Sequence, residues 1–388
     1  MSLAQYSINW ATNLCGEAAS FFHTSSLPKP SRTVIQNVHI WDGEKRIPNT
    51  SIVIEGQRIS LTGDTSGAKI VNGNNGFLMP GLIDAHVHAS NKLGLKTLAL
   101  SGITTAFDMG SFPTSQMPQW HDVGEQGIAS LWFSGAAACV DGGFPAILPG
   151  FPDDSIITSK ERAKNYAQIR INEGVDFLKI FVNDEQLPKE EYQKIIKTVG
   201  EENDIYLVTH APDFKAQEIA RKVGGKFITH VPKEQTLLKE GVQEMLDKNQ
   251  TAIPTLIMMQ HLIKAGSLLG KPWEYRFAND SVALMYKMGV PILVGTDATK
   301  PGEGLVLYGP SMHTEMGLLH DAGMSNEDIL RGATSLTAKH FRLTDRGKIA
   351  PGMRADLLLL TADPLEDISN SDKIRQIWTA GTAVKLIY

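Results

Sequence analysis

Residues 175–210, VDFLKIFVNDEQLPKEEYQKIIKTVGEENDIYLVTH, contain two short apolar runs separated by an amphipathic segment. The runs VDFLKIFV and IYLVTH have the length and the β-branched and aromatic content of buried strands. The segment between them, KEEYQKIIKTVGEEN, repeats its apolar residues at helical spacing. A strand, a helix and a strand in this order predict a βαβ unit, whose two strands lie parallel in one sheet.

The same alternation extends over the middle of the chain, residues 77–343. Six further apolar runs have the features of strands: GFLMPGLIDAHVH, ITTAFDM, IASLWFSG, KFITH, TAIPTLI and PILVGTD. A second amphipathic segment, DFKAQEIARKVGG, lies between two of them. Eight strands alternating with helices over about 260 residues have the number and size of a (β/α)8 TIM barrel, which is the α/β fold we predict.

The two ends of the chain differ from this middle. From Thr33 to Asp64, apolar and polar residues alternate between turn signals such as Asp42-Gly43, which is an antiparallel β pattern. The C-terminal stretches GKIAPGMRADLLLLTADP and QIWTAGTAVKLIY are similar in kind. We therefore predict three parts: an N-terminal extension or linker (1–31), a small composite β-sandwich domain (32–76 plus 344–388) and the barrel (77–343).

Composition excludes several classes of protein. The 388 residues carry a net charge of −5, which argues against nucleic acid or an anionic membrane as the partner. No apolar stretch approaches the roughly 18 residues of a membrane span, and no signal peptide is predicted. With only Cys15 and Cys139, a disulfide framework is excluded and a cytoplasmic location is predicted. A homo-oligomer is left open.

Candidate site residues come from the strand ends, because active sites of such barrels lie at the carboxyl ends of the strands. Two residues spaced two apart in a strand share one face, as in the pair HVH. Five strands place metal-binding residue types at or near this end: His86, His88, Lys179, His210, His230 and Asp297. Their convergence predicts a metal centre, although each alone has an ordinary interpretation as a hydrogen-bonded histidine or a helix-capping aspartate.

Lys179 needs separate treatment. Its strand neighbours on the same face are Phe177 and Phe181, so its amine is predicted to point into an apolar interior. Burial of a charged amine is costly and lowers its pKa. Lys179 is therefore either paired with a carboxylate or present as a neutral amine that can take up carbon dioxide to form a carbamate.

The segments GLIDAHVH, VDFLKIF, LVTH, FITH and VGTDA resemble, in order and across nearly the whole chain, the amidohydrolase superfamily. The segment GATSLTAKHFRLTDRGKIAPGMRADLLLL resembles the tail of its cytosolic hydrolases, most closely the imidazolonepropionase-like and prolidase-like branch. The resemblance implies a barrel that carries a β-sandwich built from both chain ends. It also implies that Lys179 is an N6-carboxylysine that bridges two metal ions.

The implied ligand set suggests a mechanism. His86, His88, Lys179 and Asp297 would hold one divalent cation, while Lys179, His210 and His230 would hold the second, with a hydroxide between them. Imidazole and carboxylate ligands favour Zn2+, and oxygen-rich variants admit manganese or cobalt. Two such cations bring the pKa of bound water near about 7. Asp297 would take the proton of this nucleophile and deliver it to the leaving amine.

The substrate is predicted only as a small molecule with an amide bond, such as a dipeptide or an N-acyl amino acid. The loop GAAACVDGGFPAILPGFPDDS after the third strand is predicted to roof the site. Candidate substrate contacts on other loops are Asn183, Lys300, Tyr308 and His313. The stretches HAPD and HVPK depart from prolidase-like relatives, which commonly have a small residue or glycine after these histidines.

Three other functions are weighed against amide hydrolysis. The same two-metal site could hydrolyse an ester, a lactone or a phosphoester, because the fold does not fix the substrate. A mononuclear site could deaminate a heterocycle, which would require Lys179 to be an ordinary amine. A non-catalytic scaffold is the least favoured, because every ligand position is filled in this sequence.

Overall fold

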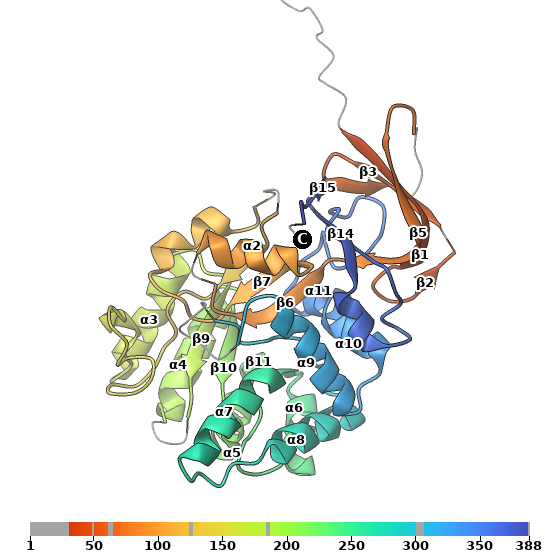
Figure 1. The fold of residues 1–388 in the computed structure, drawn as a ribbon. Coiled ribbons are helices and arrows are strands. Elements are labelled where there is room, and N and C mark those ends of the chain that lie inside the picture. Colours follow the sequence, from red (N-terminus) through yellow and green to blue (C-terminus); the bar gives the residue numbers. More distant parts are fainter. Residues whose placement is uncertain are drawn as a thin grey trace, which may run out of the picture. The chain divides into compact units, whose positions relative to one another are not determined.

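The computed structural model describes residues 31–48, 50–60, 65–89, 91–123, 127–183, 187–299 and 306–386 (Figure 1). Residues Arg32–Tyr388 form one compact unit. The predicted N-terminal extension, residues 1–31, lies outside the described residues except for Ser31. None of the described helices combines the length and the hydropathy that crossing a membrane requires.

Two parallel sheets occupy the middle of the chain, in the orders β6-β7-β8 and β12-β11-β10-β9. Nearly all residues of these strands are buried, because helices cover one face and the other lines the interior. This explains why their sequences are continuous apolar runs rather than alternating ones. The strands are β6 (Leu82–Val87), β7 (Ile103–Asp108), β8 (Ser130–Phe133), β9 (Phe177–Phe181), β10 (Tyr206–His210), β11 (Phe227–Thr229) and β12 (Thr251–Ile253).

Backbone hydrogen bonds join the two sheets into a ring. Beyond β8, Ala138 pairs with Ile180 of β9 in a parallel bridge. On the other side, the segment 291–298 forms one parallel bridge to β12 and one to β6. This segment takes the place of the eighth strand, although its hydrogen bonding is too irregular to form a continuous one. The predicted (β/α)8 barrel is confirmed.

Helices follow the strands and surround the ring (Figure 1). The two amphipathic segments quoted above form α4 and α5, as predicted, and α4 buries Tyr192, Ile196 and Val199 on one face. Ser159 and Ser325 cap α3 and α10 through their hydroxyl groups. The helices are α2 (Lys92–Leu100), α3 (Lys160–Asn172), α4 (Glu190–Glu202), α5 (Phe214–Val223), α6 (Lys239–Asp247), α7 (Leu256–Leu268), α8 (Tyr275–Met288), α9 (Pro310–Asp321), α10 (Asn326–Gly332) and α11 (Ser335–His340).

Aromatic rings fill the amino-terminal end of the barrel. Phe177 and Phe227 are the first residues of β9 and β11, and both are fully buried. Phe341, which follows α11, stacks on Phe227 and on Phe107 of β7 at centroid distances of 4.2 and 3.8 Å. We call Phe107, Phe177, Phe227 and Phe341 the aromatic plug. Its rings pack against one another as an apolar layer inside the barrel.

Strands from both chain ends share one further sheet, in the order β15-β14-β13-β5-β1-β3-β4, with β2 paired to β1. In Figure 1 the red-orange strands from the first part of the chain lie beside the blue strands from the last part. These strands have their own apolar core, which includes Ile54, Leu357 and Trp378. They are β1 (Arg32–Trp41), β2 (Arg46–Ile47), β3 (Ser51–Glu55), β4 (Arg58–Ser60), β5 (Lys69–Pro80), β13 (Leu357–Leu360), β14 (Ile374–Thr379) and β15 (Thr382–Ala383).

The composite origin of this β-structure agrees with the prediction, and two details differ from it. The antiparallel pattern holds for β1 with β3 and for β3 with β4, whereas β1 and β5 pair in parallel. In addition, β5 extends to Pro80, beyond the predicted boundary at residue 76, because its last residues pair with β13. The domain boundaries themselves stay a prediction.

Candidate metal centre

The six predicted ligands meet at the carboxyl end of the barrel. His86 lies in β6 and His88 directly after it, Lys179 lies within β9, and His210 ends β10. His230 follows β11, and Asp297 lies near the end of the segment 291–298. The ring centroid of His230 lies 5.1 Å from that of His86 and 4.3 Å from that of His210. Segments far apart in the sequence therefore build one cluster.

Asp297 is the centre of this cluster. Its Oδ1 lies 3.2 Å from Nε2 of His86 and 2.9 Å from Nε2 of His88, and its Oδ2 lies 4.0 Å from Nδ1 of His230. Burial by itself would raise the pKa of Asp297, but the charges and hydrogen bonds of His86 and His88 outweigh it and hold this pKa well below its usual range. Asp297 is therefore an anion among imidazoles.

Three of the four histidines of the cluster are held neutral, and His88 is the exception. Burial, together with the nearby charge of Lys179, lowers the pKa of His86 well below its usual range, and burial lowers that of His230 to about 3. Burial likewise lowers the pKa of His210. For His88, burial acts in the same direction, but the hydrogen bond that its ring donates to Asp297 and the charge of Asp297 prevail and raise the pKa.

Unpartnered nitrogen atoms test whether these residues suit a metal ion. Nδ1 of His86 and Nε2 of His230 are buried and have no hydrogen-bond partner among the described residues. Leaving buried polar atoms unpaired is unfavourable, so such atoms call for a ligand. One ligand atom each from His86, His230 and Asp297 lies within 4.8 Å of the others. Neutral imidazoles with one carboxylate fit a divalent cation such as Zn2+.

Lys179 is fully buried, as its neighbours Phe177 and Phe181 predict. Its Nζ donates a hydrogen bond of 3.1 Å to Oγ1 of Thr229. Among the residues that the structure describes, no carboxylate forms an ion pair with it. Burial lowers the pKa of Lys179 to about 7, so the neutral amine is accessible near neutral pH. The carboxylate-paired alternative is thus not found in the described part of the chain.

His230 is positioned by residues that the sequence did not single out. Its Nδ1 lies 2.7 Å from Oγ1 of Thr255, and its Nε2 has no hydrogen-bond partner among the described residues. Thr255 directly precedes α7, and Glu315 of α9 accepts hydrogen bonds from the first two N–H groups of α7, those of Leu256 and Ile257, at 2.8 and 2.7 Å. Such outer contacts fix the tautomer and orientation of a metal ligand.

Backbone strain is concentrated in the same place. His230, Thr255 and Asp297 have φ angles of +71°, +50° and +60°. These lie in the left-handed region, which residues other than glycine rarely adopt. Each such residue costs about 1–3 kcal/mol, and they persist where the surrounding structure fixes them. Three of them at the ends of consecutive strand segments indicate a functional site.

Two further features bring the first strand and the eighth segment together. Asp84 accepts hydrogen bonds from the N–H groups of His86 and Thr296 at 3.1 Å, and from Oγ1 of Thr296 at 2.7 Å. A Cβ on Gly295 would lie 2.6 Å from the Ile253 side chain and 3.0 Å from that of His86, so only glycine permits this approach. The GTDA segment thereby holds Asp297 against His86.

Other polar residues near the cluster were missed in the sequence. Asp108, the last residue of β7, is buried and accepts hydrogen bonds from Gly110 and Ser111, and its charge acts on His88 and Lys179. Its position at a strand end, in ITTAFDM, was a signal that could have identified it. Thr255 and Glu315 carry no such signal.

The two unusual stretches HAPD and HVPK turn out to be partners. Lys233, the last residue of HVPK, forms an ion pair with Asp213, the last residue of HAPD. Both side chains are buried, and the Lys233 Nζ lies 4.7 Å from the centroid of the Trp273 ring. The pair joins the loops that follow His210 and His230. The residues at which HAPD and HVPK differ from the relatives that the sequence resembles therefore include a pair that contact each other, Asp213 and Lys233.

The residues predicted to contact substrate differ in their burial and in their hydrogen-bond partners. Asn183, two residues beyond the end of β9, is half-buried, whereas Tyr308 is buried and its hydroxyl donates to the His88 carbonyl at 2.5 Å. Lys300 lies outside the described residues. His313 has its ring nitrogens 3.0 Å from Oγ of Ser371 and 3.1 Å from the Ser101 carbonyl.

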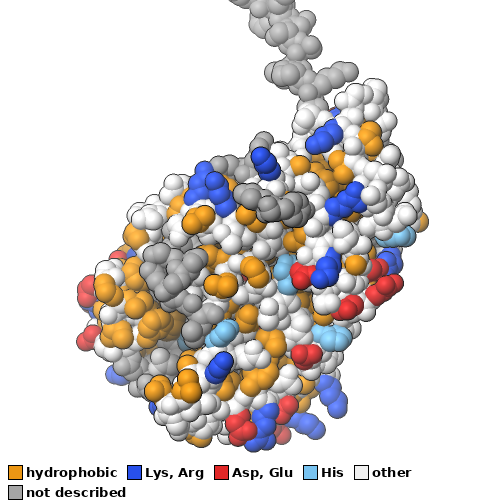
Figure 2. All heavy atoms as spheres, in the orientation of Figure 1, with side chains coloured by type: hydrophobic (Ala, Val, Ile, Leu, Met, Phe, Trp, Pro, Cys, Tyr) orange, Lys and Arg blue, Asp and Glu red, His pale blue; other side chains and the backbone are white. Residues whose placement is uncertain are grey.

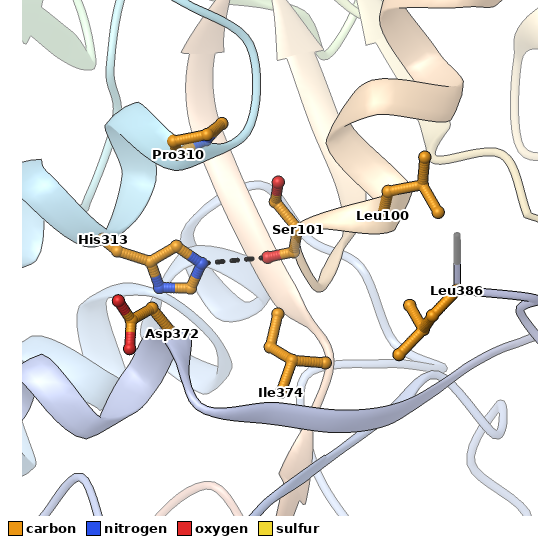
Figure 3. A pocket seen from close by; sticks show the side chains of 7 residues that line it. All are labelled: Leu100, Ser101, Pro310, His313, Asp372, Ile374 and Leu386. Carbon is orange, nitrogen blue, oxygen red and sulfur yellow. Dashed lines mark hydrogen bonds between the residues drawn. The ribbon is translucent and has the colours of Figure 1, made fainter. Parts of the chain in front are cut away.

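His313 lines a different cavity, of about 390 Å³, formed by Leu100, Ser101, Pro310, His313, Asp372, Ile374 and Leu386 (Figure 3). These residues come from α2, α9 and the C-terminal segment rather than from the strand ends that carry the six ligands. The structure therefore does not bring His313 to the cluster.

Comparisons with known proteins agree with this geometry. The sequence model of the Amidohydrolase family matches residues 77–384. The chain is 24% identical to an imidazolonepropionase from Idiomarina loihiensis, over 87% of this chain and 92% of that protein. It is 25% identical to adenine deaminase 2 from Shouchella clausii over 85% of this chain, which spans 56% of that protein.

Solved structures share the fold at lower sequence identity. A crystal structure of a Xaa-Pro dipeptidase with bound methionine superposes with a TM-score of 0.78 at 20% identity, covering 92% of this chain and 100% of that one. The structure of molinate hydrolase has a TM-score of 0.75 at 18% identity, covering 92% of this chain and 95% of that one. Both structures therefore share the fold of this chain, the barrel together with its accompanying β-structure.

Proposed function

Because this chain belongs to the amidohydrolase family and is a hydrolase of carbon–nitrogen bonds, we propose that it hydrolyses an amide in a small molecule, such as a dipeptide or an N-acyl amino acid, at a two-metal centre. The observation that carries this proposal is the contact of one buried carboxylate, Asp297, with His86 and His88, in a cluster where His230 keeps an unpartnered, buried Nε2. Such a donor set suits a hydrolytic metal site.

His86, His88, Lys179 and Asp297 would hold one cation, and Lys179, His210 and His230 the other. Zn2+ is the proposed metal, because four imidazole ligands dominate the set. Bound divalent cations supply an acidified water and polarise the scissile carbonyl group. The protein's part is to hold these ligands in the fixed geometry that Thr255, Asp84 and the strand ends impose.

Lys179 would take part as a carbamate. The neutral amine would attack carbon dioxide, forming an N–C bond as one C=O π bond opens to an oxygen anion, and the proton released from the nitrogen would pass to water. The product would carry a negative charge and two oxygen atoms that could serve as metal ligands. The buried amine without a described carboxylate partner, and with its pKa lowered by burial to about 7, favours this reaction.

Asp297 would move the proton during catalysis. One of its oxygens takes the proton of the attacking water, and the same carboxyl group then delivers it to the leaving nitrogen. Its anionic state supports the first of these steps, since a carboxylate must be ionised to accept a proton. The contacts with His86 and His88 fix its orientation.

The test uses the zinc-loaded protein and a panel of dipeptides and N-acyl amino acids. Asp297→Asn should lower turnover by about 100-fold to 10,000-fold, the range expected for a general acid–base group, while metal content measured by mass spectrometry stays largely intact. Asp280→Asn, on the exposed face of α8, is the matched control and should retain full turnover. Turnover of Asp297→Asn at about a tenth of wild type or more would rule out this role.

Heterocycle deamination at a single metal is the second candidate. It is favoured by the hydrogen bond of Lys179 Nζ to Thr229, which suits an unmodified amine, and by the similarity to adenine deaminase 2. Metal content decides between the two, because the deaminase would hold one cation per chain. A carbamate signal after labelling with 13C-bicarbonate would support the two-metal centre. Ester, lactone and phosphoester hydrolysis would emerge from the substrate panel.

A cytoplasmic location and a homo-oligomer complete the proposal. The first rests on the two cysteines of the sequence. The second is left open and would be measured by sedimentation. A small-molecule substrate, rather than a nucleic acid or a membrane, fits the net charge of −5.

A further inference from the structure

The loop between β8 and α3 exposes large apolar side chains. Phe144, Ile147 and Leu148 are 52%, 67% and 36% exposed. Figure 2 shows hydrophobic side chains gathered on the left of the molecule, beside α3. This is the loop predicted to roof the site, because it follows the carboxyl end of a barrel strand. Clustered apolar exposure of this kind marks a binding surface more often than scattered single residues do.

The loop has a defined conformation. The N–H of Ile147 donates to the Gly143 carbonyl at 3.1 Å, and that of Leu148 to the Pro145 carbonyl at 2.9 Å. The base of the loop is tied as well, since the N–H of Cys139 donates to the Ser155 carbonyl at 3.0 Å. The exposed side chains are therefore presented by a folded loop, which is suited to a preformed pocket wall.

Ring contacts connect this loop to the metal ligands. Phe144 meets Phe181 edge to face at a centroid distance of 5.7 Å. Phe181, only 7% exposed, stacks on His210 at 4.2 Å, and His210 contacts His230 at 4.3 Å. An unbroken line of aromatic rings thus runs from the exposed Phe144 to the histidine cluster. A molecule whose reacting bond lies at the cluster can place an apolar group against Phe144.

We propose that Phe144 and Phe181 form an apolar wall of the substrate pocket, so that the enzyme selects amides carrying a large apolar or aromatic side chain. This inference rests on the proposed amide hydrolysis and names the class of substrate that the site takes. Ile147 and Leu148 extend the wall outward on the same loop. Contact with this wall removes apolar surface from water in both substrate and protein, which favours binding of large apolar groups over small or charged ones.

A small molecule is the occupant that the contacts favour. The wall does not end on the outer surface but continues through Phe181 to a candidate metal ligand. A partner protein or a second copy of this chain would cover Phe144, Ile147 and Leu148 without needing that continuation. Selectivity among substrates is therefore the property to measure.

The experiment compares the N-acetyl derivatives of phenylalanine, leucine, alanine and aspartate on the zinc-loaded full chain. Wild type should show a kcat/KM for the phenylalanine compound at least about 10-fold above that for the alanine compound. Phe144→Ala should reduce this ratio by about 10-fold, mainly through KM, because the lost contact is made in the bound ground state as well as in the transition state. Phe144→Leu should restore part of the ratio.

Leu268→Ala is the matched control, because Leu268 is 84% exposed at the end of α7 and belongs to neither the wall nor the cluster. It should leave the ratio unchanged. An unchanged ratio in Phe144→Ala would overturn the inference, and so would a wild type that prefers alanine or aspartate. A change in sedimentation of Phe144→Ala with an unchanged ratio would instead assign the loop to contact between copies.

Failure of this inference can be distinguished from failure of the proposed function. If amides are hydrolysed but the ratio of kcat/KM values is the same with and without Phe144, the inference of an apolar wall is wrong and the proposed function stands. If no amide is hydrolysed, the apolar wall can still be tested by equilibrium binding. Calorimetry measures the binding of the same compounds to Asp297→Asn. In that background, Phe144→Ala should weaken the Kd of the phenylalanine compound by about 10-fold. Equal Kd values with and without Phe144 would overturn the inference.

Discussion

The two ends of the barrel are built from the same strands and have opposite properties. At the amino end, the aromatic plug packs rings against rings, with Phe341 stacked on Phe107 and Phe227. At the carboxyl end, His86 and His230 keep unpartnered nitrogen atoms, and His230 and Asp297 have left-handed backbones. Strand β9 carries both characters within three residues, Phe177 at the plug and Lys179 at the cluster.

This contrast separates stability from function. The plug buries apolar surface and satisfies every requirement of a core, so it lowers the free energy of the folded state. The polar end buries charge, leaves donors and acceptors unpaired and strains the backbone, all of which oppose folding. The packed end and the surrounding helices must hold the polar end in place until metal ions bind and satisfy its ligands.

Metal removal should produce the largest difference between the two ends, because it should abolish activity at the polar end and leave the plug folded. Treatment with a chelator should lower activity by at least about 100-fold, while circular dichroism shows the secondary structure retained at 25 °C, because the plug does not depend on the metal. Added Zn2+ should restore activity and raise the Tm, since ligands that bind only the folded state stabilise it. Unfolding on chelation would show that the polar end also carries the fold.

Removing the plug should produce the reverse pattern. Phe341→Ala should lower the free energy of unfolding by roughly 3 kcal/mol, the lower end of the range for such substitutions because Phe341 is partly exposed. Denaturant unfolding measures this loss, and the metal content of the folded variant should equal that of wild type. Leu268→Ala, at an exposed site, should change neither quantity. Loss of metal from folded Phe341→Ala would show that metal binding at the polar end depends on the plug.

Thr255 offers a smaller test at the polar end. Thr255→Val removes the oxygen that contacts His230 Nδ1 and should weaken metal binding by about 10-fold to 100-fold, the usual effect of losing a contact to a ligand. Thr255→Ser keeps the hydroxyl group and should retain most of the affinity. Competition with a chromophoric chelator measures both. Equal affinities for the valine and serine variants would show that the contact does not position His230.

Glu315 provides a test that is seen as a pH dependence of stability. Burial raises the pKa of Glu315 to about 8, against about 4.3 in an unfolded chain. Between these values the folded state binds more protons than the unfolded state, so stability from this group falls as pH rises. The Tm of metal-free wild type relative to Glu315→Gln should therefore be highest near pH 5 and decline toward pH 8.

Glu202→Gln, on the exposed side of α4, is the control for this comparison and should follow wild type at every pH. Parallel Tm curves for wild type and Glu315→Gln would mean that Glu315 titrates alike in the folded and unfolded states. In that case the carboxylate is held ionised by the N–H groups of Leu256 and Ile257.

The barrel and its six candidate ligands were predictable because both depend on local patterns. Apolar runs such as VDFLKIFV specify buried strands, and the order of strands and helices specifies a parallel ring. Once the fold is set, the last residues of strands must meet at one end, which locates His210 and His230 without any contact information. Asp108 ends a strand in the same way, so the same reasoning applies to it.

Other parts of the site depend on contacts between distant segments. Lys233 and Asp213 were noticed as unusual residues, but nothing in HAPD or HVPK says that they pair with each other. Glu315 lies in a helix whose sequence gives no sign that it caps α7. His313 follows the eighth segment on a barrel loop, yet its ring turns toward Ser101 and Ser371. Side-chain direction in loops and helices follows from packing rather than from sequence position.

The sequence by itself determined the alternation of strands and helices, the chemistry at the strand ends and the burial of Lys179, since hydrophobic period and residue type act locally. Only the tertiary structure decided which nitrogen of His230 is bound by Thr255 and which loop brings the exposed Phe144 against Phe181, the neighbour of His210. The reason is physical: these contacts join residues tens of positions apart in the sequence, and their geometry exists only after the chain has packed.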